Sequence, residues 1–201
     1  MVRRATEGCE ELKCPVNYLK KEAVLFLIMK NPHNLDELVA LVNYNDEVIG
    51  KATRDEVHSK GLLHRETYCY LINSKNQVLL QRRKDNLLWD HSSAGHFPFN
   101  QTYEEGIVRE FEEELGIKLP KKYFKEIAKE KISLSRIKNI RIVKVFLVKK
   151  DIALEKFKID TAELSEIKYF NKYELKKLLL SDELTLSAKY LIDKYILPLL
   201  K

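Results

Sequence analysis

The chain has 201 residues, of which 45% are hydrophobic. This length fits one ordinary domain with a small appendage, and the apolar fraction is sufficient for a core, which excludes wholesale disorder. The longest apolar run, residues 23–29, is far too short to span a bilayer and has no signal-peptide cleavage pattern. We therefore expect a soluble, cytoplasmic protein without a membrane partner.

The formal net charge is +6, and the excess is concentrated in residues 118–158, which hold 14 Lys or Arg against 4 Asp or Glu. A basic surface attracts phosphates, whether of nucleotides, polyphosphates or nucleic acid. No basic run there exceeds two residues, so a solvated lysine-rich surface is the more ordinary interpretation, and nucleic acid is not favoured as the partner. Three cysteines do not make a disulfide framework; Cys9 and Cys14 lack a second metal-binding pair, and Cys69 is expected in the core.

The first 35 residues form an N-terminal appendage in this interpretation, with a short helix over 18–29, and residues 36–201 form the main domain. Two apolar runs, 38–42 and 47–50, flank a turn and predict a hairpin. Thr53 and Glu56 have the spacing of a capping box and predict a short helix. A second hairpin is expected from residues 66–73 and 78–83.

A helix is predicted over residues 102–115, with Thr102 and Glu105 as its capping box and Gly116 as its C-terminal stop. Strands are expected at 140–148 and 164–170, followed by helices at about 172–180 and 187–199. These elements show no regular βαβ alternation. The pattern therefore indicates an α+β fold with a mixed sheet.

Three acidic residues share one face of the helix at 102–115, because Glu110, Glu113 and Glu114 stand at i, i+3 and i+4. Like charges at this spacing repel one another by a few tenths of a kcal/mol per pair. Carboxylate oxygens are the ligands that a hard divalent cation prefers. The spacing thus suggests a metal site, with an ordinary solvated acidic face as the alternative.

Residues 95–117 resemble the Nudix box, the motif of the Nudix hydrolase superfamily. The matching pattern reads Gly95-x5-Gln101-x7-Arg109-Glu110-Phe111-x-Glu113-Glu114-x-Gly116-Ile117. Every position matches except Gln101, where the family has Glu. Residues 45–83 and 88–96 also look like the branch related to type I isopentenyl-diphosphate isomerase, and the resemblance covers roughly residues 36–175.

The resemblance implies a Nudix fold, with a mixed sheet sandwiched between helices, and a metal-dependent pyrophosphohydrolase. The substrate would be a small molecule with a diphosphate bond, such as a nucleoside diphosphate derivative, and the cofactor Mg2+ or Mn2+. The implied catalytic and metal-binding residues are Glu110, Glu113 and Glu114, with the Gly95 carbonyl as a further ligand; which glutamate is the general base stays open. Arg109 would hydrogen-bond Gln101, and the further supporting residues are Arg82, His64, His96 and Glu163.

An isopentenyl-diphosphate isomerase is one alternative, and a catalytically weak Nudix binding module is another. The isomerases place a catalytic Cys where this chain has Ala94, and a Glu where residues 138–142 carry no acid. Both differences disfavour isomerisation. His64 and His96 match metal-binding positions of the isomerase, with His58 nearby. A further alternative is an RNA-end processing enzyme, and a homodimer is compatible with the first hairpin and the appendage.

Overall fold

The computed structural model describes residues 36–134 and 139–201. The appendage predicted at 1–35, with Cys9 and Cys14, lies outside the described residues. The strands of the described part are β1 (Leu38–Val42), β2 (Val48–Thr53), β3 (His64–Ile72), β4 (Val78–Arg83), β5 (Trp89–Asp90), β6 (Ser93–Gly95), β7 (Lys125–Leu134), β8 (Asn139–Lys149) and β9 (Leu164–Phe170). The helices are α2 (Arg54–Lys60), α3 (Tyr103–Leu115), α4 (Lys172–Leu179) and α5 (Leu186–Leu191), which continues as a π-helical turn (Ile192–Ile196) and a 3-10 turn (Leu197–Leu199).

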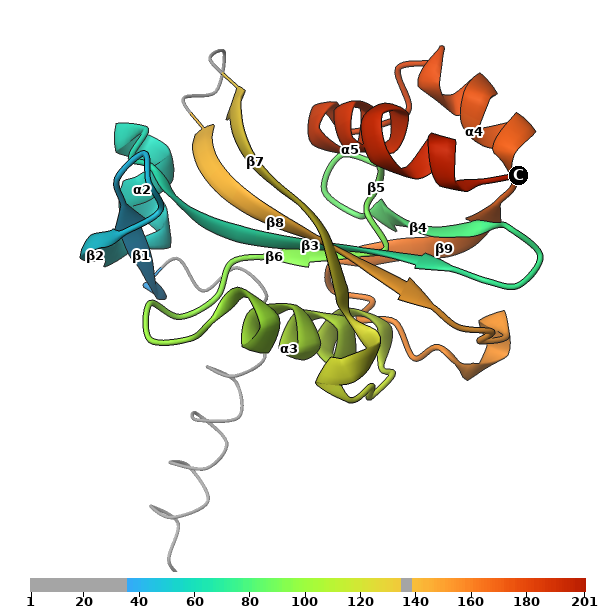
Figure 1. Ribbon diagram of the computed structural model, residues 1–201, viewed down its shortest axis with the longest axis horizontal. Helices are drawn as coiled ribbons and strands as arrows, with labels where there is room; N and C mark the ends of the chain where they lie inside the picture. The colour runs from blue at the N-terminus through green and yellow to red at the C-terminus, as the bar shows by residue number, and fades with distance from the viewer. Residues whose placement is uncertain (1–35, 135–138) are drawn as a thin grey trace, which may run out of the picture. The chain divides into compact units, whose positions relative to one another are not determined.

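The strands form one mixed sheet (Figure 1). Strands β3 and β8 run parallel, with His64 opposite Arg141, and the other pairs of the sheet are antiparallel. Strand β4 pairs with β3 only at Leu71 and Ile72, and then continues beside β9. The middle of β3 is left to β6, where Ala94 lies opposite Tyr68. This arrangement brings residues 93–95 beside the centre of the sheet.

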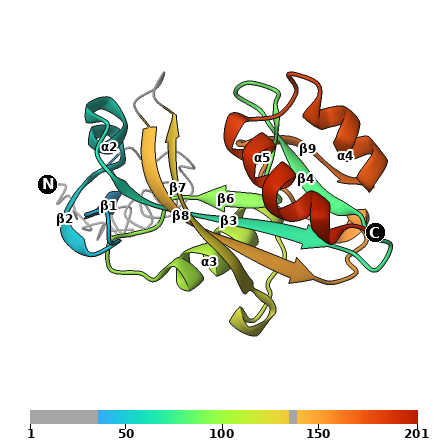
Figure 2. The ribbon, with the colours of Figure 1, turned by 45° about the horizontal axis from the view of Figure 1, so that its top comes forward.

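Helices cover both faces of the sheet (Figures 1 and 2). On one face, α3 buries Ile107, Phe111 and Leu115 against alternate residues of β3 and β8. On the other face, α4 and α5 pack over Tyr68, Tyr70 and their neighbours. Side chains of a strand alternate between its two faces, so one strand contributes to both cores. The α+β class and the Nudix-type sandwich predicted from the sequence are confirmed.

The predicted ends of α3 are confirmed by its capping residues. Thr102 and Glu105 form the expected reciprocal cap of α3, and Gly116 ends the helix at φ 66°, a left-handed conformation that favours glycine. The two predicted hairpins, the later strands and α4 are also present. Strand β7 was not predicted. Cys69 is fully buried in the core, as expected.

No helix in the described ranges has the length and apolarity that a membrane crossing requires.

Candidate active site

Glu114 is the most firmly held carboxylate of α3. Its side chain is buried, and it accepts hydrogen bonds from Gln81 Nε2 on β4 (3.0 Å) and from the backbone N–H of Ala94 on β6 (3.0 Å). The last turn of α3 is thereby connected to two strands that are not adjacent in the chain. The carboxylate thus has a fixed position at the junction of β4 and β6.

Glu110 lies directly against Gly95. A Cβ added at Gly95 would lie 2.5 Å from the carboxyl group of Glu110, so any side chain there would displace this carboxylate. Arg109 donates to Glu110 Oε1 (2.6 Å), to Glu113 Oε2 (2.5 Å) and to the carbonyl of His96 (2.8 Å). Glu113 is half exposed on the outer side of α3. The structure therefore brings Glu110 and Glu114 to β6, whereas Arg109 holds Glu113 on the helix surface.

The electrostatics of this group favour a bound cation. Burial raises the pKa of Glu114 to about 8 and raises the pKa of Glu110 well above its usual range. The negative charges of Glu114 and Glu113 raise the pKa of Glu110 further. Burial also raises the pKa of Glu163, on the loop before β9, to about 7. Since buried carboxylates are costly to ionise without a counter-charge, oxygen ligands in this state fit a hard divalent cation.

The expected hydrogen bond between Arg109 and Gln101 is wrong. Arg109 is engaged by Glu110, Glu113 and a backbone carbonyl, and Gln101 Oε1 has no hydrogen-bond partner. Without a carboxylate at position 101, the guanidinium turns to the charged groups of its own helix.

Arg82 also has partners of its own. It donates to the carbonyl of Leu87 (2.8 Å), pairs with Glu166 (3.5 Å) and lies 5.7 Å from the centre of the Trp89 ring. Trp89 itself is buried in the core beneath α4 and α5. Arg82 therefore braces the β4–β5 turn against β9.

A second group of potential ligands lies on the other side of β6. The Nε2 atoms of His58 and His64 lie 3.1 and 3.2 Å from Nε2 of His96, and Glu66 Oε1 lies 3.2 Å from the same atom. All four ligand atoms are within 4.8 Å of one another, and three of the four residues are buried. In the described part of the chain, this is the place where three or more such ligands converge; the α3 glutamates are not gathered in this way.

The hydrogen bonding of His64 shows why this histidine group suits a metal ion. Its Nδ1 lies 2.8 Å from the carbonyl of Leu62, which can only accept, so a neutral His64 carries its proton on Nδ1. Its Nε2 then presents a lone pair to the other ligands. Burial lowers the pKa of His96 well below the usual value, which keeps the His96 imidazole neutral. Neutral imidazoles with converging lone pairs fit a transition metal ion.

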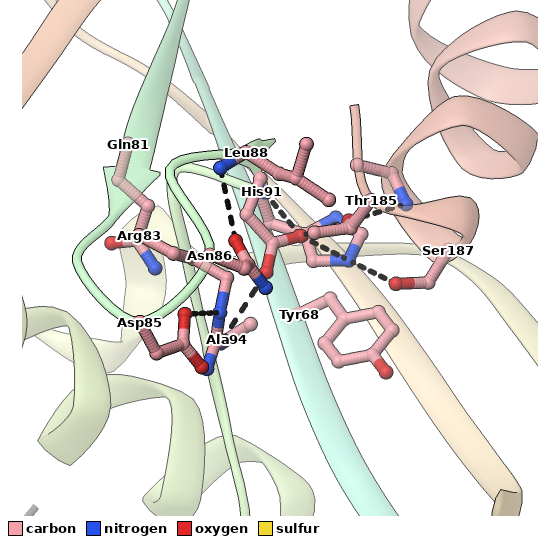
Figure 3. Close-up of polar contacts among 12 residues, drawn as sticks. Tyr68, Gln81, Arg83, Asp85, Asn86, Leu88, His91, Ala94, Thr185 and Ser187 are labelled. Atoms are coloured by element: carbon pink, nitrogen blue, oxygen red, sulfur yellow. Dashed lines mark hydrogen bonds and ion pairs between the residues drawn. The ribbon is translucent and has the colours of Figure 1, made fainter. Parts of the chain in front are cut away.

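A buried polar network that includes Tyr68 and His91 reaches α5 (Figure 3). The Tyr68 hydroxyl donates to Glu66 and so connects this network to the histidine group. Tyr68 stacks on His91 at 4.1 Å, and His91 contacts Tyr70 Oη (2.6 Å) and Ser187 Oγ on α5 (3.3 Å). Ala94 on β6 lies opposite Tyr68 on β3. Position 94 is the one at which the isomerases have a cysteine. The side chains next to position 94 are therefore polar, but Ala94 itself has no proton to donate.

We call the cluster of α3 glutamates (Glu110, Glu113 and Glu114) the carboxylate group. It meets the histidine group (His58, His64, His96 and Glu66) at two consecutive residues. Gly95 receives Glu110 on one side, and His96 directs its ring into the histidine group while its carbonyl accepts from Arg109. Sequence reasoning missed Glu66 and Arg141, which form an ion pair at 3.0 Å. The alternation along β3 was the available signal, because it places the side chains of His64 and Glu66 on the same face.

Comparisons with known proteins agree with this geometry. A family model described as the NUDIX domain matches residues 62–194. Isopentenyl-diphosphate Delta-isomerase 2 of Photorhabdus laumondii is 28% identical over 150 residues, which cover 72% of this chain and 83% of that protein. Nudix hydrolase 3 of Arabidopsis thaliana is 34% identical over 142 residues, which cover 65% of this chain but 18% of that protein. A crystal structure of a protein from Deinococcus radiodurans superimposes with a TM-score of 0.65 at 21% identity, covering 79% of this chain and 98% of that one.

The family model covers about two thirds of the chain, and the chain therefore belongs to the NUDIX domain family. It is an enzyme of the class that hydrolyses diphosphate bonds, a Nudix pyrophosphohydrolase. The likeness to the solved structure concerns the fold alone.

Proposed function

We propose that the carboxylates of α3 hold Mg2+ or Mn2+ and that this site hydrolyses the diphosphate bond of a small molecule such as a nucleoside diphosphate derivative. The observation that carries the proposal is the pairing of two buried carboxylates with β6. Glu110 is packed on Gly95, and Glu114 is held between Gln81 and the N–H of Ala94. Both glutamates occupy the positions that the Nudix box assigns to metal ligands.

Glu110, Glu113 and Glu114 would hold the cation, with the Gly95 carbonyl as a further ligand. A divalent cation bound there neutralises phosphate oxygens, stabilises the leaving oxygen and makes a nearby water more acidic. Glu113 has to leave Arg109 to join this set. Arg109 then keeps its contacts with Glu110 and with the carbonyl of His96, so the loop stays attached to α3.

We assign the general base to Glu163 or to one of the α3 glutamates. A base works best when its pKa lies near the operating pH. The pKa of Glu163 is raised by burial to about 7, and its charge acts on both Glu110 and Glu114. Glu163 can therefore exchange a proton with water close to the diphosphate at neutral pH.

A small substrate is favoured over nucleic acid, because part of the basic excess is neutralised within the fold. Lys129 pairs with Asp46 (2.5 Å), and Lys144 pairs with Glu104 (3.1 Å) and Glu126 (2.8 Å). These lysines are committed to intramolecular contacts in the stretch that suggested a phosphate-binding surface. The homodimer and the cytoplasmic location stay predictions.

The isomerase alternative has sequence support, since the relative from Photorhabdus laumondii is named as one. Two observations speak against it. Ala94 has no proton to give, and the stretch that matches the isomerase acid, residues 138–142, carries no acid. A catalytically weak Nudix binding module is the remaining alternative.

A substrate panel distinguishes these alternatives. Wild-type protein and Glu114→Gln are incubated with nucleoside diphosphate derivatives and with isopentenyl diphosphate, in Mg2+, Mn2+ or EDTA. We expect metal-dependent release of phosphate or nucleoside monophosphate by the wild type and no isomerised product. Isomerisation by the wild type would support the alternative enzyme, and an absence of any turnover across the panel would support a binding module.

A further inference from the structure

The carboxylate of Glu66 faces two different environments with its two oxygens. Oε1 lies 3.2 Å from His96 Nε2 and 3.4 Å from His64 Nε2. Oε2 lies 3.0 Å from Arg141 Nε and accepts a hydrogen bond from the hydroxyl of Tyr68. Oε1 is thus directed into the histidine group, and Oε2 is held by Arg141 and Tyr68.

Arg141 is placed by the sheet to hold this carboxylate. It lies on β8 opposite His64, in the parallel register that continues with Glu66 opposite Val143. Only 4% of Arg141 is exposed, so its charge is removed from water and depends on protein partners. Its Nε makes an ion pair with Glu66 rather than a well-aligned hydrogen bond. The pair is therefore electrostatic and fixes the direction of the Glu66 carboxylate.

The spacing of the ligand atoms matches a four-ligand metal site. The edge of a tetrahedron around Zn2+ is about 3.3 Å for bonds of about 2.0 Å. Four of the six separations between ligand atoms are 3.1 Å (His58–His96), 3.2 Å (His64–His96), 3.2 Å (Glu66–His96) and 3.4 Å (Glu66–His64), and the other two are at most 4.8 Å.

We propose that Glu66 supplies the fourth ligand of a transition-metal site with His58, His64 and His96, and that Arg141 is its positioning residue. The resemblance to the isomerase accounts for metal binding at His64 and His96, but not for these two residues. In this chain the strand that would carry the isomerase acid presents Arg141, and the carboxylate comes from β3. The metal site is thereby complete without an acid on β8.

Three imidazole nitrogens and one carboxylate oxygen favour Zn2+ over Mg2+, because imidazole suits Zn2+ whereas Mg2+ prefers oxygen ligands and retains water. The chain then holds two kinds of metal site on either side of β6. Substrate plays no part in this assignment, so it stands or falls separately from hydrolysis.

The test is a metal-binding titration of the full chain without substrate and with excess Mg2+. Zn2+ affinity is measured by competition with a chelator, and Co2+ serves as the spectroscopic probe. We expect one equivalent of Zn2+ to bind to the wild type and Co2+ to give the intense visible absorption of a tetrahedral site. Glu66→Gln should change this spectrum. Arg141→Gln should weaken Zn2+ affinity by about 10- to 100-fold, the usual cost of losing such an outer partner, and Arg141→Lys should restore part of it.

Arg65→Gln is the matched control, because Arg65 on β3 also pairs with a largely buried carboxylate, that of Asp46 (2.6 Å), which is not one of the proposed ligands. We expect it to lower the melting temperature and to leave Zn2+ affinity unchanged. An Arg141→Gln protein with wild-type Zn2+ affinity would overturn the positioning role, and an unchanged Co2+ spectrum in Glu66→Gln would overturn the ligand. If Arg141→Gln does not fold, Arg141→Lys decides, since wild-type affinity and spectrum together in that variant would contradict the proposed geometry.

Discussion

The carboxylate group of α3 and the histidine group differ in how far they are assembled. The four ligand atoms of the histidine group already converge within 4.8 Å. In the carboxylate group, Glu110 and Glu114 are buried against β6, whereas Glu113 is half exposed and bound to Arg109. One group is preorganised, and the other has to rearrange when a cation enters.

This difference follows from the supporting contacts. Each glutamate of α3 is fixed by one or two contacts, and Arg109 is shared between two of them. The histidine group has ligands from α2, β3 and the residue that follows β6, and the rings of His64 and His96 stack at 5.1 Å. An exchangeable cation and substrate suit the first arrangement, and a resident metal ion suits the second. Variants of the two groups separate these roles.

The largest effect is expected for Glu114→Gln. This change removes a buried charge from the centre of the carboxylate group, and turnover should fall by about 10²- to 10³-fold, the size typical of losing one preorganised electrostatic contact. Steady-state phosphate release measures it. Glu112→Gln is the control on the same helix, because Glu112 is exposed and pairs with Lys118 (3.3 Å). Equal rates for Glu114→Gln and the wild type would show that Glu114 does not take part in catalysis.

Gly95→Ala tests the close approach of β6 to Glu110. The new Cβ would lie 2.5 Å from the carboxyl group, so Glu110 has to move. A displacement of about 1 Å costs about 10²-fold in rate, and we expect a loss of this order. At Gly50 the nearest atom to an added Cβ, on Leu41, is 3.8 Å away, so Gly50→Ala should retain activity. Similar rates for the two variants would contradict the packing argument.

The metal-free protein should lose stability as the pH rises. The pKa of Glu114 is about 8 in the folded protein against an ordinary value of 4.5. Below pH 4.5 the group is protonated in both states, but between pH 4.5 and 8 the unfolded chain releases a proton that the folded chain retains. The contribution of Glu114 to the free energy of unfolding should therefore fall by up to about 1.4 kcal/mol per pH unit in this window.

Chemical denaturation in EDTA across this pH range measures the effect. Glu114→Gln should show a smaller slope and should be more stable than the wild type at pH 8. Added Mg2+ should stabilise the wild type more at pH 8 than at pH 6. The slopes are compared above about pH 6.5, because below it the lowered pKa values of His58, His91 and His96 act in the opposite direction. Equal slopes for the wild type and Glu114→Gln in that range would contradict a buried, uncompensated carboxylate.

Much of the carboxylate site could be predicted from the sequence, because its spacing lies within one helix. The helix itself is marked by its capping box at Thr102 and by Gly116. Strand β7 escaped prediction because its sequence is dominated by alternating Lys and Glu, and its place in the sheet is set by pairing with β8. The sheet register likewise brings Glu66 and Arg141 together across 75 positions. No local pattern encodes such a contact.

The contacts of Arg109 illustrate the same limit at a shorter distance. The motif predicts a partner at position 101, but the choice among several nearby acceptors depends on their charge and position. Glu110 and Glu113 offer carboxyl groups on the same helix as Arg109, whereas Gln101 offers a neutral amide. The motif identifies the residues of the site, whereas the hydrogen bonds between them depend on the folded geometry.

The smallest effect is expected for Gln101→Glu. A carboxylate at this position gives Arg109 a charged partner outside α3, which should free Glu113 for the cation. Since partly exposed ion pairs contribute up to about 1 kcal/mol, the rate should rise by about five-fold at most. Turnover at several Mg2+ concentrations measures this change. A large fall in rate would show that Arg109 needs its present contacts.

The central claim is that the α3 carboxylates, and not the histidine group, carry hydrolysis. The most direct measurement is Mg2+-dependent phosphate release by the wild type and by the double variant Glu110→Gln/Glu114→Gln, with the Zn2+ content of each protein determined in parallel. We expect the double variant to lose turnover and to keep its Zn2+. A double variant that still hydrolyses the substrate at the wild-type rate would contradict the account.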